Sequence, residues 1–319
     1  MNSMLRNGRT INLFNTIYCK MSTKFPPVVT PMLPAETFKG KVALVTGGGT
    51  GLGKGMATIL SRLGASVAIA SRRLPVLEKA ALEISESTGN KVLPVQLDVR
   101  NPDGVKEAVD EVVAKLGLPN IVINNAAGNF VSPFERLSPN AFKTIVDIVL
   151  NGTANVTLDV GKRLIKANQG AAFLSITTWY ADLGSGYVVP SACAKSGVDA
   201  MTKSLSSEWA KYGIRLNTIA PGPIHTEGAF SRLDPTGKWT EEGLKKIPVG
   251  RFGEIEELAN LAAYMVSDYS NFMNGEVVCF DGGERRGYSA VFGQLSQVTD
   301  DQWEMLEKMI RSTNKKSKL

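Results

Sequence analysis

Lys41-Val-Ala-Leu-Val-Thr46-Gly-Gly-Gly-Thr-Gly-Leu-Gly53 is the stretch of this chain that decides its fold. Its first six residues form a short apolar, β-branched run, which predicts a buried strand. A helical pattern of apolar residues follows from Met56 to Leu60. A glycine-rich turn between strand and helix lets backbone N–H groups and the helix N-terminus approach a pyrophosphate, although a plain glycine-rich turn is the alternative. The candidate phosphate-binding residues are Gly47, Gly49, Thr50, Gly51, Leu52 and Gly53.

The end of the next predicted strand indicates which dinucleotide fits. The run Ser66–Ser71 is followed by Arg72 and Arg73. A site for NAD needs an acid at this strand end to accept a hydrogen bond from the ribose 2′-hydroxyl, and Ser71 stands there instead. A guanidinium makes charge-assisted bonds to a 2′-phosphate, so Arg72 favours NADP(H). Two solvated arginines at a helix start are the alternative, which the helix dipole disfavours.

Strands and helices then alternate along the rest of the chain. Further strands are expected at 91–96, 120–124, 172–176, 214–219 and 276–280, with a helix at 102–116. This alternation predicts a single α/β domain, a Rossmann-type doubly wound parallel sheet of about seven strands. Ligands of such sheets lie at the carboxyl ends of the strands. Polar residues follow several of these ends, at Arg72, Asp98, 125–129 and 177–180.

Composition and charge exclude several classes of protein. The chain has 319 residues and a formal charge of +6, but nine basic residues lie at its two acid-free ends. The body, residues 36–307, therefore carries about −3, which gives no basic face for nucleic acid. No apolar run reaches the ~18 residues that span a bilayer. His225 is the only histidine and the three cysteines are scattered, which argues against a histidine-based hydrolase and predicts no metal site.

The two ends carry signals that conflict. Residues 1–21 are basic, hydroxyl-rich and acid-free, as in a mitochondrial presequence, with an unstructured arm as the alternative. Residues 22–37 form a proline-rich linker arm before a domain predicted at 38–298. Residues 299–319 contain a predicted helix at 303–311 and end in Ser-Lys-Leu, a peroxisomal address. The mitochondrial matrix is the first expectation and the peroxisome the second, and initiation at Met21 would remove the presequence.

The chain resembles the short-chain dehydrogenase/reductase family over residues 38–285. The markers are 46–53, 124–126, Lys195 and 221–223. The resemblance implies that Asp98 holds the adenine and Lys195 the nicotinamide ribose, and that the carboxamide side is held by Pro221, Gly222, Pro223 and Ile224. The family's tyrosine, four residues before its lysine, is replaced by Ser191. A serine hydroxyl is far less acidic than a phenol and cannot act as the acid near neutral pH. The family's asparagine and serine fall at Val149 and Thr178.

One branch of the family, the mitochondrial type of 2,4-dienoyl-CoA reductases, resembles the chain more closely. The matching stretches are 124–130, 175–178 with Tyr180, 189–192 with 194–195, and 228–235. The resemblance implies an NADPH-dependent conjugate reduction of a dienoyl-CoA in the β-oxidation of unsaturated fatty acids, by a homotetramer. Tyr180 and Asn129 would then stabilise the charge on the thioester oxygen, with Lys195 beside the cofactor. The acyl-CoA site would be lined by Arg100, Phe130, Ser138, Ser191 and Arg232.

Other interpretations remain open from the sequence. A different enoyl-CoA reductase would share the fold and NADPH, and a non-catalytic NADPH-binding protein would bind cofactor without turnover. Tyr180 could cap the core, Asn129 could serve a turn, and Arg232 could be a solvated loop charge. The apolar face of the predicted C-terminal helix, Trp303, Leu306 and Ile310, could pack on the body or on a neighbour.

Overall fold

The computed structural model describes residues 24–224, 226, 243–290 and 292–316, and in them seven parallel strands form one sheet. The strand order is β3-β2-β1-β4-β5-β6-β7, so the chain starts at the centre and winds outward in both directions. This confirms the predicted doubly wound sheet and its number of strands. The strands are β1 (Val42–Thr46), β2 (Ser66–Ser71), β3 (Val92–Gln96), β4 (Ile121–Asn124), β5 (Ala171–Ile176), β6 (Ile214–Pro221) and β7 (Val277–Phe280).

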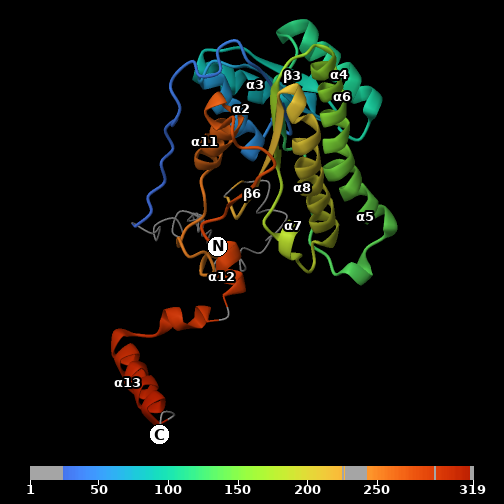
Figure 1. Cartoon of the computed structure of the whole chain (residues 1–319). Helices are drawn as coiled ribbons and strands as arrows, with labels where there is room; N and C mark the ends of the chain where they lie inside the picture. The colour runs from blue at the N-terminus through green and yellow to red at the C-terminus, as the bar shows by residue number, and fades with distance from the viewer. Residues whose placement is uncertain (1–23, 225, 227–242, 291, 317–319) are drawn as a thin grey trace, which may run out of the picture.

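Helices cover both faces of the sheet, as Figure 1 shows. One layer contains α2 (Gly51–Arg62), α3 (Leu74–Thr88) and α11 (Ile255–Val266). The other contains α4 (Pro102–Leu116), α6 (Gly152–Lys166) and α8 (Val189–Trp209). Shorter elements complete this part of the fold, namely α5 (Pro139–Val146), the π-helical turn η2 (Asp147–Asn151) and α7 (Tyr180–Leu183).

Strand β1 shows why the strands are continuous apolar runs. All five of its residues are buried, because helices pack on both of its faces. Side chains alternate along a strand, so Ala43 and Val45 join the core under α2, α3 and α11, whereas Leu44 joins the core under α4 and α6. The polar residues that follow the strands lie outside these two cores, at the carboxyl edge of the sheet.

Helix α2 begins at Gly51, five residues before the apolar pattern from which we expected it. The turn after β1 is therefore only Gly47–Thr50 long, and Gly51 and Gly53 lie in the first helical turn. Gly47 has a φ of +66°, which favours glycine. A Cβ on Gly53 would lie 2.3 Å from the Gly47 carbonyl oxygen. The glycines thus allow the helix to pack closely on the turn. Because glycine adds nothing to the apolar pattern, the start of α2 could not be recognised from that pattern.

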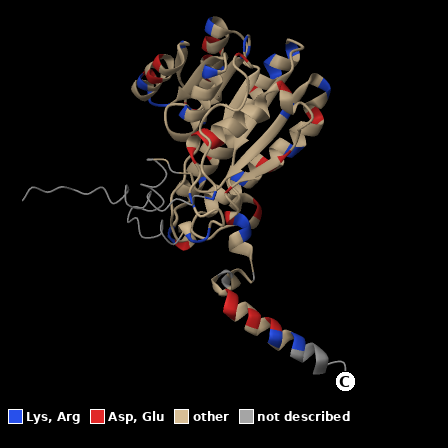
Figure 2. Ribbon diagram, turned by 90° about the vertical axis from the view of Figure 1, so that its left-hand side faces the viewer, with Lys and Arg blue, Asp and Glu red and all other residues tan. Residues whose placement is uncertain are grey.

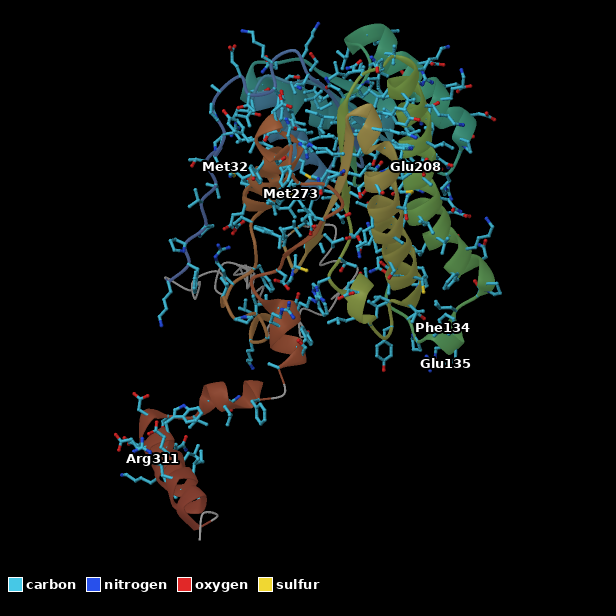
Figure 3. The ribbon with its side chains drawn as sticks, viewed as in Figure 1. Met32, Phe134, Glu135, Glu208, Met273 and Arg311 are labelled. Atoms are coloured by element: carbon cyan, nitrogen blue, oxygen red, sulfur yellow. The ribbon has the colours of Figure 1, made fainter. Side chains whose placement is uncertain are left out.

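The N-terminal arm runs beside α11. The Met32 N–H donates to Asn260 Oδ1 at 3.0 Å, and Asn260 Nδ2 donates to the Thr30 carbonyl at 2.8 Å. The Arg251 guanidinium reaches the Phe25 carbonyl at 2.6 Å. Figure 3 shows Met32 on the arm as it passes this helix. The arm is therefore held by side chains that recognise its backbone.

The C-terminal segment leaves the body from the end of the sheet where the strands finish (Figure 1). It contains α12 (Glu284–Ser289), the short η5 (Gly293–Gln297) and α13 (Asp300–Lys316). Helix α13 contains the helix predicted at 303–311 but extends away from the body, with Met305 and Ile310 exposed. Acidic residues lie in its first half and basic residues in its second half (Figure 2). No helix in the described ranges is both long and apolar enough to cross a membrane.

Candidate active site

Three polar side chains from separate elements meet at the carboxyl edge of the sheet. Asn129 lies in the loop after β4, Tyr180 begins α7 after β5, and Ser191 lies in the first turn of α8. Asn129 Nδ2 donates to the Tyr180 hydroxyl oxygen at 3.2 Å, and the hydroxyls of Tyr180 and Ser191 are 3.3 Å apart. The topology therefore brings together residues up to 62 positions apart that the sequence singled out individually.

The backbone fixes the orientation of the Asn129 amide. The N–H of Phe130 donates to Asn129 Oδ1 at 2.9 Å, so the amide nitrogen is the group that faces Tyr180. Because the Tyr180 oxygen accepts this bond, its own proton remains available for another acceptor. Tyr180 and Asn129 are half-buried, whereas Ser191 is only 2% exposed. Of the two hydroxyls in this cluster, that of Tyr180 thus belongs to the more exposed residue.

Lys195 lies one helical turn after Ser191 and is buried. Its ammonium group donates to the Ile176 carbonyl at the end of β5. Burial lowers the pKa of Lys195 to about 8, and the nearby carboxylate of Asp199 opposes this shift. An ammonium with this pKa is still mostly charged at pH 7. Lys195 therefore places a positive charge at the strand end beneath the Tyr180 cluster.

Val149 and Thr178 stand where the family that the sequence resembles has an asparagine and a serine. Val149 lies in the π-helical turn η2 and is fully buried against Ala194 and Val198. It has no group that could relay a proton. Thr178, at the other position, is also buried. Val149 therefore supplies no polar group to the site, whereas Thr178 retains a buried hydroxyl.

The first βα turn has features of an anion site. Thr50 is the N-cap of α2, yet no side chain caps this helix, and its first turn contains no acid. The N–H groups of that turn are therefore available to a phosphate. Across the site, Gly222 follows β6 so closely packed on Asp281 that a Cβ would lie 2.7 Å from the Asp281 Cα. The segment 221–224 thus lies beside the strand ends, as its predicted role in holding a nicotinamide requires.

The predicted adenine end of the cofactor site is a cavity of about 520 Å³. Arg72 lines it, and within the described ranges the Arg72 guanidinium makes no ion pair. Asp98 is paired with Arg100, whose Nε lies 3.0 and 3.1 Å from the two carboxylate oxygens. This pair lowers the pKa of Asp98. The residues lining the cavity are Arg72, Gln96, Leu97, Asp98, Asn101, Gly104, Glu107, Ala108 and Glu111.

The remaining predicted substrate residues are separated in the structure. Phe130 follows Asn129 in the chain and contacts the small core around Val149. Ser138 is exposed, and its hydroxyl accepts the Ala141 N–H at 3.1 Å as the N-cap of α5. Arg100 lies at the adenine end, with Asp98. Arg232 falls outside the described residues, as do the presequence and the last three residues.

Sequence reasoning missed Trp179, which contacts the cluster, and its hydrogen-bond partner Glu284. Trp179 precedes Tyr180, and its ring centroid lies 5.9 Å from that of Tyr180. Its indole N–H donates to the Glu284 carboxylate of α12 at 2.7 Å. Asp182 of α7 also pairs with Arg285 of α12. The only available signal was the position of Trp179 next to Tyr180, because nothing in the sequence links it to residue 284.

Comparison with known proteins gives consistent matches. A family model described as enoyl-(acyl carrier protein) reductase matches residues 47–284. A probable 2,4-dienoyl-CoA reductase 3 of Caenorhabditis elegans, named as (3E)-enoyl-CoA-producing, is 47% identical over 94% of this chain and 99% of its own length. A peroxisomal 2,4-dienoyl-CoA reductase of Danio rerio is 36% identical over 82% of this chain and 85% of its own.

Solved structures agree with the fold. A short chain dehydrogenase from Bacillus anthracis is 41% identical, with a TM-score of 0.71 over 78% of this chain and 98% of its own. A 2-deoxy-D-gluconate 3-dehydrogenase, so described for Agrobacterium tumefaciens and solved with bound NADP, is 29% identical, with a TM-score of 0.72 over 79% of this chain and 99% of its own.

Proposed function

Since the chain belongs to the short-chain dehydrogenase/reductase family of oxidoreductases, we propose that it reduces 2,4-dienoyl-CoA to trans-3-enoyl-CoA with NADPH. The observation that carries this proposal is the contact of Tyr180 with Asn129 and Ser191. A carbonyl reductase of the family needs its acidic phenol where Ser191 stands. Here the phenol comes from another element and is paired with an amide donor, which suits the stabilisation of an oxyanion.

The residues of the cofactor strip fit NADPH. The uncapped N-terminus of α2 would hold the pyrophosphate, and Arg72, which lines the cavity, would hold the 2′-phosphate. Lys195 would hold the nicotinamide ribose, and residues 221–224 the carboxamide. Bound NADPH supplies a hydride for the far end of the conjugated chain. The choice of NADPH over NADH rests on Arg72 and on the absence of an acid at Ser71.

The side chains at the strand ends act on the substrate. As the diene is reduced, negative charge develops on the thioester oxygen, which becomes the oxygen of a dienolate. The Tyr180 proton and the Asn129 amide donate toward this oxygen, and the buried charge of Lys195 adds positive potential. These groups are in place before the reaction, so the chain spends little energy on reorienting them.

The position of the final proton decides the product. The dienolate accepts a proton either at the α-carbon, which leaves the 3-enoyl product, or at the γ-carbon, which leaves a 2-enoyl product. Ser191 is too weak an acid for this step, and Val149 offers no relay. A water molecule that reaches the α-carbon from the open side supplies the proton, and the remaining double bond then lies between carbons 3 and 4.

The acyl-CoA is held by groups around this centre. Phe130 lies next to Asn129 and gives the acyl chain an apolar contact. Arg100 and Arg232 supply guanidinium groups for the CoA phosphates, and Ser138 supplies a hydroxyl. To bind a phosphate, Arg100 has to share or release Asp98, because its Nε and one terminal nitrogen are both engaged there.

Assembly and location complete the proposal. The enzyme works as a homotetramer in the β-oxidation of unsaturated fatty acids. Residues 1–21 direct it to the mitochondrial matrix, and the terminal Ser-Lys-Leu directs a second pool to the peroxisome. Initiation at Met21 separates the two pools. N-terminal sequencing of the protein from each organelle tests this, and one identical species found in a single compartment contradicts it.

The test of the activity is NADPH consumption by the full-length chain. We expect turnover with a 2,4-dienoyl-CoA and none with a 2-enoyl-CoA. Turnover of the 2-enoyl-CoA alone identifies a different enoyl reductase. Binding of NADPH without turnover of either substrate identifies a non-catalytic protein.

A further inference from the structure

A buried carboxyl group lies close to the Tyr180 cluster without belonging to it. Glu284 is the first residue of α12 and is only 8% exposed. Its carboxylate accepts the indole N–H of Trp179 at 2.7 Å, a bond between residues 105 positions apart. A buried carboxyl is costly to ionise, and the hydrogen-bond partner of this one is an indole beside the site.

Trp179 contacts both Glu284 and Tyr180. The two residues are adjacent in the chain, and their rings meet edge to face with centroids 5.9 Å apart. On its other side the indole packs on Tyr288 of α12, with centroids 5.5 Å apart. The indole is therefore held between the Tyr180 ring and α12, and the Glu284 bond sets its rotation about the side-chain axis.

We propose that Glu284 is a positioning residue for the reduction: by holding the Trp179 indole, it keeps the Tyr180 hydroxyl within hydrogen-bonding distance of Asn129 and Ser191. This inference rests on the proposed function, because the position of the Tyr180 hydroxyl matters only if Tyr180 donates to an oxyanion. Glu284 itself touches neither Asn129 nor Ser191. It acts through one hydrogen bond and one ring contact.

The charge of Glu284 makes its hold on the Trp179 indole sensitive to pH. Burial raises its pKa to about 6, the Trp179 bond opposes this, Asp281 raises it further and Lys246 lowers it. Of the other charged groups on α7 and α12, Asp182 and Arg285 form an ion pair, and Arg286 is exposed. Above pH 6 the carboxylate makes a charge-assisted bond to the indole, and below pH 6 the bond is weaker.

A purely structural role for α12 makes a different prediction. The helix is also held by the Asp182–Arg285 ion pair and by the Lys246 ammonium over the Tyr288 ring, at 4.6 Å. If Glu284 only attached α12, its loss would lower stability at every pH and leave the pH profile of turnover unchanged. If Glu284 positions Trp179, its loss changes kcat and also the decline of kcat at acid pH.

The first experiment measures kcat and KM against pH for the full-length wild type, Glu284→Gln, Trp179→Phe and the double variant. Glu86→Gln removes an exposed carboxyl on α3 and is the control. We expect each single variant to lower kcat at pH 7.5 about three- to ten-fold, with KM for NADPH unchanged. The wild-type kcat should fall below pH 6, and this limb should be absent from both variants. The double variant should be no worse than either single one.

The second experiment follows tryptophan fluorescence without substrate. The wild-type emission minus that of Trp179→Phe should change with a midpoint at about pH 6. Glu284→Gln should abolish the transition, and Glu86→Gln should keep it. This readout also shows that the variants are folded.

Three outcomes overturn the inference. They are an unchanged kcat and acid limb in Glu284→Gln, a fluorescence transition that survives in Glu284→Gln, and additive losses in the double variant. Failure of the wild type to turn over any dienoyl-CoA is a separate result. It overturns the proposed function, and with it the positioning role, whereas an active wild type with an unaffected Glu284→Gln overturns the positioning role alone.

Discussion

The Asn129 amide nitrogen donates to the Tyr180 hydroxyl oxygen at 3.2 Å, so the phenolic proton is free for a second partner. In this arrangement the amide also polarises the phenol. A tyrosine that only capped the core would have its hydroxyl satisfied by the backbone. The hydroxyl of Tyr180 instead contacts two side chains on separate elements.

Replacing Tyr180 by phenylalanine removes the donor but keeps the ring against Trp179. We expect kcat with a dienoyl-CoA to fall about 10²- to 10³-fold, because one oxyanion donor is lost. NADPH affinity should not change, since the ring does not line the cofactor strip. Steady-state kinetics with a fluorescence titration of NADPH checks both values. Ser191→Ala is the matched control and should lose less than Tyr180→Phe, and equal losses would contradict the assignment.

Replacing Asn129 by aspartate retains shape but reverses the electrostatics. The new carboxylate cannot donate and would repel the developing oxyanion, so kcat should fall about 100-fold or more. Phe130 N–H can still donate to it, which should preserve the loop. Asn140→Asp, at an exposed position of α5, is the control. A turnover number within twofold of the wild type would exclude Asn129 from the site.

Arg72 should decide between the two nicotinamide cofactors. We expect Arg72→Ala to raise KM for NADPH about 10- to 100-fold and to leave KM for NADH unchanged, because only NADPH carries the 2′-phosphate. The neighbouring Arg73→Ala should have a smaller effect. The measurement is the ratio of kcat/KM for the two cofactors. A ratio that does not change in Arg72→Ala would assign the phosphate to another residue.

Gly53→Ala tests the packing of α2 on its turn. Its Cβ would lie 2.3 Å from the Gly47 carbonyl oxygen, so either the helix or the turn has to move. We expect a loss of about 2–4 kcal/mol in the free energy of unfolding, together with weaker NADPH binding. Gly243→Ala is the control, because no atom of the described residues lies within 4 Å of its added Cβ. Thermal melts with and without NADPH give both quantities.

The raised pKa of Glu284 predicts how stability depends on pH. The folded chain holds this proton up to about pH 6, whereas the unfolded chain releases it near 4.5. Glu284 therefore contributes stability that is complete below pH 4.5 and is lost as the pH rises through 6. Relative to Glu284→Gln, the wild type should lose about 1 kcal/mol between pH 4.5 and 7.5, after allowance for solvent screening. Melting curves at both pH values check the sign. A constant difference would contradict it.

The strands could be predicted from the sequence because burial on both faces makes each one a continuous apolar run. The prediction at 214–219 therefore differs from β6, Ile214–Pro221, only at its end. The site residues that follow the strands could be predicted for the same reason, since parallel strands place their carboxyl ends at one edge. The start of α2 could not, because Gly51 and Gly53 have no side chains to show a helical face.

Contacts between distant segments had no signal in the sequence. Trp179 and Glu284 meet only because β5 and β7 end at the same edge of the sheet, and no spacing rule connects them. The pairing of Asp98 with Arg100 was also missed. Each residue had been given a different ligand, although they are two positions apart and can satisfy each other first.

The two hydrogen bonds by which Asn260 holds the N-terminal arm have an evolutionary consequence. Both of its hydrogen bonds end on main-chain atoms, the Thr30 carbonyl and the Met32 N–H. Position 30 can therefore accept any residue, and position 32 any residue except proline, without loss of these bonds. Position 260 needs a side chain that both donates and accepts at this reach. Among related sequences the arm should drift in composition while the asparagine that holds it stays fixed.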